Sequence, residues 1–200
     1  MIIAVTDRRI SALRDFLDQI EAIATASPDM IILREKDLSE AGYRYLAVEC
    51  QRICDYHNVK FCVNSFLNVA ASINNGRVQL PFDPFIANVG KLNNFEEVWV
   101  SVHSKYESVE AEKNGATHLI YGNVFETTCK PDAIGKGINE LKEVCGSVRI
   151  PVFAIGGIDT GNVGMVIDAG CKGICVRNLL MRSTDPHTTM DELRKRIKKR

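Results

Sequence analysis

Eight short apolar runs separated by amphipathic stretches constrain the fold of this chain more than any other feature. Each run is almost continuously hydrophobic, as in IIAV at 2–5, with little polar alternation. Parallel strands that are covered on both faces have this composition. The eight expected strands are Ile2–Val5, Met30–Arg34, Lys60–Asn64, Arg77–Leu80, Glu97–His103, Thr117–Gly122, Ile150–Gly156 and Gly173–Arg177.

The stretches between these runs have the apolar spacing of helices. Ser39 and Ser104 are expected N-caps, and Gly115 and Gly170 suit helix ends that stand just before a strand. Eight strand–helix units in 200 residues predict an α/β fold, a single-domain (β/α)8 TIM barrel that spans residues 1–200. A doubly wound open sheet is the alternative, but it usually has five or six strands. Eight evenly spaced strands favour closure.

Composition excludes several classes of protein. The 25 Lys and Arg residues balance 25 Asp and Glu residues, so no nucleic acid or acidic membrane is expected as a partner. No apolar run approaches the roughly 18 residues of a membrane span, and the N-terminus lacks the basic lead of a secretory signal. Seven scattered cysteines and four unpaired histidines predict reduced thiols and no metal site. We expect a cytoplasmic protein, for which a homodimer is compatible with the sequence.

Polar residues follow every predicted strand. The active site of a TIM barrel lies at the carboxyl ends of its strands, so these residues are expected around one mouth. They are Thr6 and Asp7, Arg34 to Lys36, Asn64 and Ser65, Gln79, Ser101 and His103, Gly122 and Asn123, Gly156 and Gly157, and Arg177 and Asn178. The set is rich in groups that bind anions.

Two parts of this mouth suggest a phosphate ligand. The Gly156–Gly157 pair follows strand 7 and lets backbone amides approach an oxyanion, while Asn178 after strand 8 is placed to begin a helix. Tight left-handed turns also use paired glycines. Arg34 and Lys36 are two residues apart and point to one side, where a ligand anion, or a salt bridge to Asp7 or Glu35, would balance them.

The polar segment 122–137, between strand 6 and the next helix, is the longest such link. It carries Glu126, Thr127 and Lys130, and a long loop over a barrel mouth is typical of a lid or a substrate contact. Cys129 stands beside Lys130, but with no paired histidine we treat it as an ordinary loop cysteine.

These residues resemble a known family. LREKD at 33–37, VQLP at 78–81, SVHS at 101–104, YGNVFETTCKPDAIGKG at 121–137 and IPVFAIGGI at 150–158 are similar to the thiamine phosphate synthase/TenI superfamily. The resemblance spans nearly the whole chain. It implies a (β/α)8 barrel of this length, in agreement with the alternation of strands and helices, and a small-molecule thiazole phosphate as the ligand.

One branch of that family, the thiamine phosphate synthases, joins hydroxymethylpyrimidine diphosphate to a thiazole phosphate. Its pattern has two aspartates, after strands 3 and 4, that hold Mg2+. Here the aligned positions are Ser65 and Pro84, and Asp83 is one residue away. Since Mg2+ prefers carboxylates together with substrate phosphates, this departure disfavours the synthase.

VQLP and VFETxCK resemble the other branch, the TenI-type thiazole tautomerases. These proteins isomerise a thiazole carboxylate phosphate by proton transfer, with a histidine directly after the strand 6 glycine. Here that position is Asn123, and an amide cannot exchange protons near pH 7. His103 is the nearest replacement, with Glu126 and Cys129 behind it, although His103 serves equally well as a structural hydrogen-bonding residue.

The resemblance leads us to favour a TenI-like tautomerase, with a thiamine phosphate synthase and a non-catalytic phosphate-binding homologue as alternatives. His103, Asn123 and Glu126 are the catalytic candidates. The expected substrate-binding residues are Arg34, Lys36, Asn64, Ser101, Lys130, Gly156, Gly157, Arg177 and Asn178. Within this set Gly156, Gly157 and Asn178 would hold the phosphate, and Arg34 and Lys36 the substrate carboxylate. No cofactor is expected, and Mg2+ enters only if the synthase alternative holds.

Overall fold

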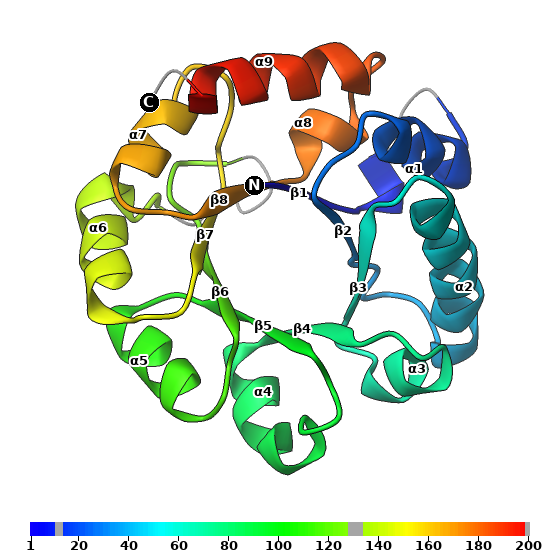
Figure 1. The fold of residues 1–200 in the computed structure, drawn as a ribbon, viewed down its shortest axis with the longest axis horizontal. Coiled ribbons are helices and arrows are strands. Elements are labelled where there is room, and N and C mark those ends of the chain that lie inside the picture. Colours follow the sequence, from blue (N-terminus) through cyan, green and yellow to red (C-terminus); the bar gives the residue numbers. More distant parts are fainter. Residues whose placement is uncertain (11–13, 128–133, 199–200) are drawn as a thin grey trace.

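The protein is a closed barrel of eight parallel strands in the computed structural model, which describes residues 1–10, 14–127 and 134–198 (Figure 1). The strands follow the order of the sequence, and β8 pairs with β1 through Cys175 and Ile3. That pairing confirms the predicted barrel and excludes an open sheet. The strands are β1 Ile2–Val5, β2 Met30–Leu33, β3 Lys60–Asn64, β4 Arg77–Pro81, β5 Glu97–Val102, β6 His118–Gly122, β7 Val152–Ile155 and β8 Gly173–Val176.

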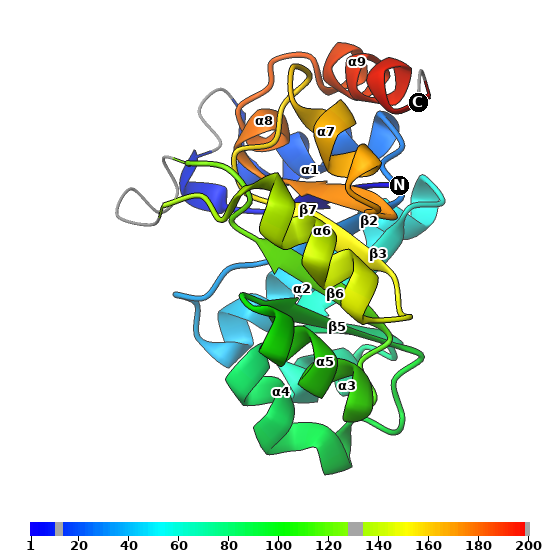
Figure 2. The ribbon, with the colours of Figure 1, turned by 90° about the vertical axis from the view of Figure 1, so that its left-hand side faces the viewer.

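Helices surround the barrel on its outside (Figure 1). They are η1 Arg8–Ile10, α1 Phe16–Thr25, α2 Glu40–Tyr56, α3 Leu67–Ser72, α4 Phe82–Asn88, η2 Val89–Lys91, α5 Lys105–Lys113, α6 Gly137–Ser147, α7 Val163–Asp168, α8 Asn178–Met181 and α9 Pro186–Lys198. The C-terminal α9 contacts both α7 and α1, so it closes the ring of helices (Figure 2). Its last turn carries Lys195, Arg196 and Lys198, which the negative end of the helix dipole favours.

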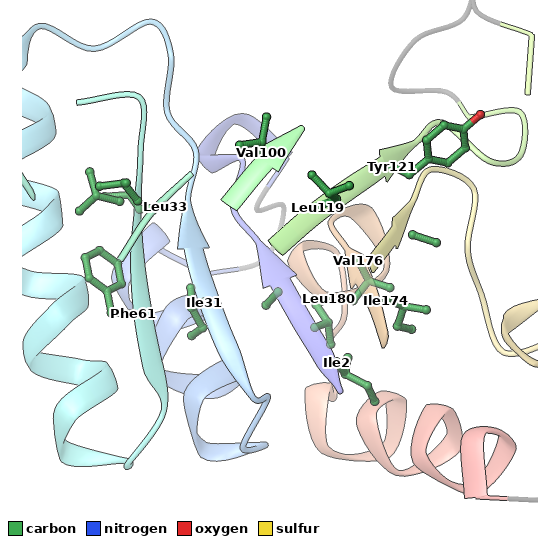
Figure 3. Close-up of a cluster of buried hydrophobic side chains, with 14 of the residues drawn as sticks. Ile2, Ile31, Leu33, Phe61, Val100, Leu119, Tyr121, Ile174, Val176 and Leu180 are labelled. Atoms are coloured by element: carbon green, nitrogen blue, oxygen red, sulfur yellow. The ribbon is translucent and has the colours of Figure 1, made fainter. Parts of the chain in front are cut away.

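Two hydrophobic layers explain the nearly continuous apolar strands. Ile3, Met30 and Trp99 belong to a buried cluster inside the barrel. Ile2, Ile31 and neighbouring side chains point outward and form a second cluster against the helices (Figure 3). Because successive residues of a strand alternate between these layers, both faces of every strand are apolar. In the described strands, polar side chains therefore gather at the strand ends.

The local signals for helix ends are confirmed. Ser39 accepts a hydrogen bond from the Gly42 amide at 3.2 Å, and Ser104 accepts one from the Glu107 amide at 3.1 Å. Gly115 and Gly170 have φ values of 92° and 102°, as glycines after helix ends usually do.

The cysteines that the structure describes are free thiols, and all except the half-buried Cys145 are buried. Cys129 lies outside the described residues. Among the described residues no group of three or more His, Cys, Asp or Glu side chains is arranged to hold a metal ion. No helix in that part of the chain is long and apolar enough to cross a membrane.

Candidate functional site

A cavity of about 620 Å³ opens at the carboxyl ends of the strands. Of the twelve residues predicted for the site, eleven line it: Arg34, Lys36, Asn64, Ser101, His103, Asn123, Glu126, Gly156, Gly157, Arg177 and Asn178. The twelfth, Lys130, lies outside the described residues. A volume of this size is typical of small-molecule sites. The structure thus brings the candidates together, while the role of each stays a prediction.

A buried carboxylate ties the ends of β1 and β2 together. Glu35 accepts hydrogen bonds from the Thr6 hydroxyl at 2.6 Å and from the Arg8 amide at 3.0 Å. The Arg8 guanidinium also contacts Glu35 at 3.2 Å and Asp37 at 2.6 Å. These contacts lower the pKa of Asp37 to about 2 through its hydrogen bond with Arg8. Glu35 therefore pairs with Arg8 and makes no ion pair with Arg34.

Asp7, at the end of β1, is shared by two arginines. Its carboxylate lies 3.2 Å from Arg9 and 3.6 Å from Arg177 at the end of β8. Burial opposes ionisation of Asp7, but the hydrogen bond and charge of Arg9, with the charge of Arg177, outweigh it and lower the pKa of the carboxyl. Asp7 therefore stays ionised while it balances more than one positive charge.

Arg34 is the least neutralised cation of this group. It is half-buried on the cavity wall, and its guanidinium makes no ion pair or hydrogen bond within residues 1–10, 14–127 and 134–198. Burial and the nearby charge of Arg177 lower its pKa, although an arginine stays protonated. We call residues 6–9, 34–37 and 177 the cationic side of the mouth.

The opposite wall carries the neutral side chains of Asn64, Gln79 and Ser101, and Ser65 lies beside this wall without lining the cavity. We call these four residues the amide side. The Asn64 side-chain amide donates to the Gln79 side-chain oxygen, and the Gln79 side-chain amide donates to the Ser101 hydroxyl at 2.8 Å. Ser65 donates to the Asn64 side-chain oxygen at 3.2 Å. These bonds join the ends of β3, β4 and β5 without any charge.

Tyr43 of α2 supports the amide side from behind. Its buried hydroxyl donates to the Leu33 backbone carbonyl at 2.6 Å and accepts from the Asn64 backbone N–H at 2.8 Å. One side chain thus satisfies backbone groups of both β2 and β3. The two sides of the mouth meet at this pair of strands.

The paired glycines are half-buried on the cavity wall, and close packing favours glycine at both positions. A Cβ on Gly156 would lie 2.4 Å from the Asn123 Cβ, and one on Gly157 would lie 2.4 Å from the Glu126 carbonyl oxygen. Both have positive φ. In the described part of the chain, the Gly157 and Ile158 amides donate no hydrogen bond although both residues line the cavity. The loop can therefore offer N–H groups to an oxyanion.

The helix expected after strand 8 is shorter than the phosphate prediction requires. α8 covers only Asn178–Met181, and α9 completes the eighth unit. A helix of one turn has little dipole, because few peptide groups are aligned in it. Any phosphate at this end therefore depends on the glycine loop more than on a helix terminus.

His103 lies on the cavity wall between the amide side and the β6 loop. Its Nδ1 is 2.5 Å from the Gly122 carbonyl oxygen, so Nδ1 carries the proton and donates. In the neutral ring this leaves Nε2 as the basic nitrogen. The residue after Gly122 is Asn123, which has no imidazole. Among the described residues that line the cavity, His103 is therefore the only histidine.

The segment 122–137 begins and ends close to the mouth. Asn123, Glu126 and Thr127 line the cavity, and the Lys136 amide returns to the Asn123 carbonyl at 3.0 Å. Residues 128–133, which include Lys130, lie outside the described part, so the proposed lid role stays a prediction.

Asp7 and Gln79 are among the strand-end residues expected around the mouth, but they are not among the twelve predicted site residues. Asp7 pairs with Arg177, and Gln79 lines the cavity between Asn64 and Ser101. A signal for Gln79 is present in the sequence, because it is a polar residue in the middle of the apolar run RVQLP. The link between Asp7 and Arg177 joins the first strand to the last and has no local signal.

The wall does not supply the carboxylates of the synthase magnesium site. Ser65 is exposed and is absent from the cavity lining, as are Asp83 and Pro84 in the first turn of α4. The carboxylates that do line the cavity, within the described residues, are Glu126 and Asp159 on the β6 and β7 loops. The side chains that line the cavity at the ends of β3 and β4 are neutral, so they do not fit Mg2+ at that place.

Comparison with known proteins finds similarity over most of the chain. The family model described as thiamine monophosphate synthase (TMP-TENI) matches residues 2–180. A curated thiamine-phosphate synthase of Clostridium acetobutylicum is 34% identical over 174 residues, which cover 86% of this chain and 82% of that protein. One of Pyrococcus abyssi is 36% identical over 195 residues, covering 96% and 92%.

Solved structures with similar folds include a thiamine-phosphate enzyme. The thiamine phosphate pyrophosphorylase of Pyrococcus furiosus superposes with a TM-score of 0.86 at 28% identity, over 99% of this chain and 95% of that one. A 3-hexulose-6-phosphate synthase superposes with a TM-score of 0.72 at 16% identity, covering 98% and 99%, and shares the fold alone.

Proposed function

The chain belongs to the thiamine monophosphate synthase family, and we propose that it acts as a synthase that joins a hydroxymethylpyrimidine diphosphate to a thiazole phosphate. The observation that carries this proposal is the similarity to curated thiamine-phosphate synthases along most of the chain. The short motifs VQLP and VFETxCK favour the tautomerase, but they cover few residues. Similarity over most of the chain therefore supports the synthase alternative more strongly than the tautomerase.

The cavity supports this proposal with two separate places for anions. The glycine loop at 156–157 would bind the phosphate of the thiazole through backbone amides. Arg34 and Lys36 would face an anionic group of the second substrate. Two phosphorylated substrates in one cavity need two such places.

The proposed reaction needs little acid–base chemistry. The bond between the pyrimidine methylene carbon and a diphosphate oxygen breaks as the methylene joins the thiazole, and the diphosphate leaves with its charge. Cations beside the leaving group stabilise that charge where it develops. Because the wall residues do not fit Mg2+, we assign this stabilisation to the protein's own cations and route no step through a metal.

The test is product formation by the purified protein. We expect thiamine phosphate to appear on chromatography when both substrates are present, and the Arg34→Ala variant to lose most of this activity with little change in melting temperature. The expected loss follows from removing a cation on the cavity wall. Absence of product with and without Mg2+ would contradict the synthase.

A tautomerase is the second candidate, favoured by one observation. His103 has its Nδ1 bonded to the Gly122 carbonyl, which leaves Nε2 able to accept a proton. Turnover of thiazole carboxylate phosphate that disappears in His103→Gln would support it. Binding of a thiazole phosphate without either turnover would favour the non-catalytic homologue.

A further inference from the structure

Two thiols of the described chain, those of Cys145 and Cys171, lie in contact. Their Sγ atoms are 3.7 Å apart and share a hydrogen bond. Cys145 is on α6, two residues before this helix ends at Ser147, and Cys171 lies in the link between α7 and β8. The helices α6 and α7 are neighbours on the outside of the barrel (Figure 1). The fold thus brings together two thiols that are 26 residues apart in the sequence.

The backbone around this pair is closely packed. A Cβ on Gly170 would lie 3.3 Å from the Cβ of Cys145, so the link before β8 presses directly on α6. On the other side of Cys171, the Lys172 amide donates to the Val152 carbonyl at 2.8 Å, which fixes the link against β7. A disulfide forms without backbone movement only between cysteines whose backbones are this close and whose side chains face each other.

The two thiols differ in their access to solvent. Cys171 is 7% exposed, whereas Cys145 is half-buried, so a dissolved reagent reaches Cys145 first. The hydrogen bond with Cys171 lowers the pKa of the Cys145 thiol despite burial, and the same bond, with burial, raises the pKa of Cys171. Because the thiolate is the nucleophile, Cys145 is the more reactive of the two. Burial raises the pKa of the other described cysteines, Cys50, Cys54, Cys62 and Cys175.

We propose that Cys145 and Cys171 form a site of reversible thiol oxidation, for which a low-molecular-weight disulfide is the oxidant. The Cys145 thiolate attacks one sulfur of that disulfide, and the other sulfur leaves as a thiolate. Cys171 then attacks the Cys145 sulfur of the mixed disulfide, and its proton passes to the second small thiol as it leaves. Two protein thiols are thereby oxidised to a disulfide, and one small disulfide is reduced to two thiols.

This site lies at the end of the barrel opposite the cavity. α6 ends before the start of β7 and Cys171 precedes the start of β8, so both thiols are at the amino ends of the strands. Neither residue lines the cavity. The new bond would close a covalent loop around β7 and α7, which contains the glycine loop at 156–157. The inference therefore goes beyond the proposed function and does not depend on it.

The first experiment maps the bond in the wild-type protein. After alkylation of free thiols, trypsin places Cys145 on peptide 143–149, Cys171 on peptide 150–172 and Cys175 on a third peptide. We expect glutathione disulfide, added to the folded protein, to link the first two peptides, and dithiothreitol to release them in mass spectrometry. A main product that links any other pair of cysteines, or the absence of a link, would overturn the proposal.

Variants then test the order of the two steps. In Cys171→Ala we expect the glutathione adduct to remain on Cys145, because no second thiol displaces it. In Cys145→Ala we expect Cys171 to take up glutathione at least about tenfold more slowly, since it is buried and its pKa is raised. Equal rates in the two variants would contradict the order. Cys171→Ser gives the same measurement if Cys171→Ala fails to fold.

Cys54→Ala is the matched control, because Cys54 is another buried thiol in the outer hydrophobic layer. The link between peptides 143–149 and 150–172 should form in it at the rate of the wild type. Loss of the link in Cys54→Ala would contradict the assignment to Cys145 and Cys171.

Thermal unfolding tests whether the native packing accommodates the bond. We expect the oxidised protein to melt about 4–8 °C above the reduced protein, because the closed loop restrains the unfolded chain. Dithiothreitol should reverse this rise, and Cys145→Ala should not show it. An unchanged or lower melting temperature of the oxidised protein would show that the bond forms only by distorting the fold, and would overturn the proposal.

Discussion

The cationic side and the amide side of the mouth are built in the same way and satisfied differently. Both consist of polar residues at strand ends, above an apolar barrel interior. On the amide side, the side chains of Asn64, Gln79 and Ser101 are hydrogen-bonded to one another. On the cationic side, Arg34 has no such partner among the described residues. Folding satisfies the hydrogen-bonding groups of the amide side, whereas Arg34 on the cationic side needs a bound anion to balance its charge.

This difference separates stability from binding. Removing a group from a self-satisfied network leaves its partners unpaired and costs stability. Removing an under-neutralised cation relieves repulsion and costs binding instead. Variants on the amide side should therefore lower stability, and variants on the cationic side should weaken anion binding without lowering stability.

The largest expected effect on stability is that of Tyr43→Phe, which removes the hydroxyl behind the amide side. It leaves the Leu33 carbonyl and the Asn64 amide without their partner. We expect a loss of about 2–4 kcal/mol in the free energy of unfolding, because each unsatisfied buried polar group costs roughly 1–3 kcal/mol. Urea denaturation followed by circular dichroism measures it.

Tyr45→Phe is the matched control, because Tyr45 lies on the same helix and is 64% exposed. Its stability should stay within about 0.5 kcal/mol of wild type. Similar losses in the two variants would show that the hydroxyl of Tyr43 does not stabilise the strand ends.

Arg34→Met should act in the opposite direction on stability. The substitution keeps a straight side chain of similar length and removes a half-buried charge whose pKa is lowered by burial and by Arg177. We expect the free energy of unfolding to rise by about 0.5–1 kcal/mol while pyrophosphate binding is lost. Denaturation and calorimetry on the same sample test both.

Arg182→Met serves as the control for this variant, since Arg182 is exposed. A decrease in stability for Arg34→Met beyond that of Arg182→Met would mean that Arg34 has a structural partner. The contrast between the two sides would then fail.

Local patterns in the sequence predicted most of the fold. Apolar runs identified all eight strands, and Ser39 and Ser104 marked two helix starts, because these signals depend on neighbours in the chain. Closure into a barrel followed from counting the strands. The one-turn α8 was not foreseen, since nothing near Asn178 shows that the chain turns away after Met181.

The sequence predicts which residues line the cavity better than it predicts which charged side chains pair with one another. Strand-end position placed eleven residues on one cavity. The pairing of Glu35 with Arg8, and of Asp7 with Arg177, depends on which strand ends are neighbours in space. Such pairings lie between distant parts of the chain, so spacing along the sequence cannot specify them.

Acid titration should give the smallest effect and again distinguish the two sides. The pKa of Asp37 is about 2, held down by its hydrogen bond with Arg8, against an ordinary value of 3.8. The folded state thus binds this proton less readily than the unfolded state. The stability from this contact is complete above about pH 4 and is lost as the pH falls toward 2.

Urea denaturation at pH 5, 4 and 3 measures this loss as a slope. We expect a shallower slope for Asp37→Asn than for wild type, and an unchanged slope for Ser65→Ala, because the amide side has no titratable group. The effect is small because Asp37 is exposed to solvent, which screens its contact with Arg8. Identical slopes for wild type and Asp37→Asn would place the acid sensitivity outside the cationic side, and the shared Asp7, whose pKa is also lowered, would then be the next residue to replace.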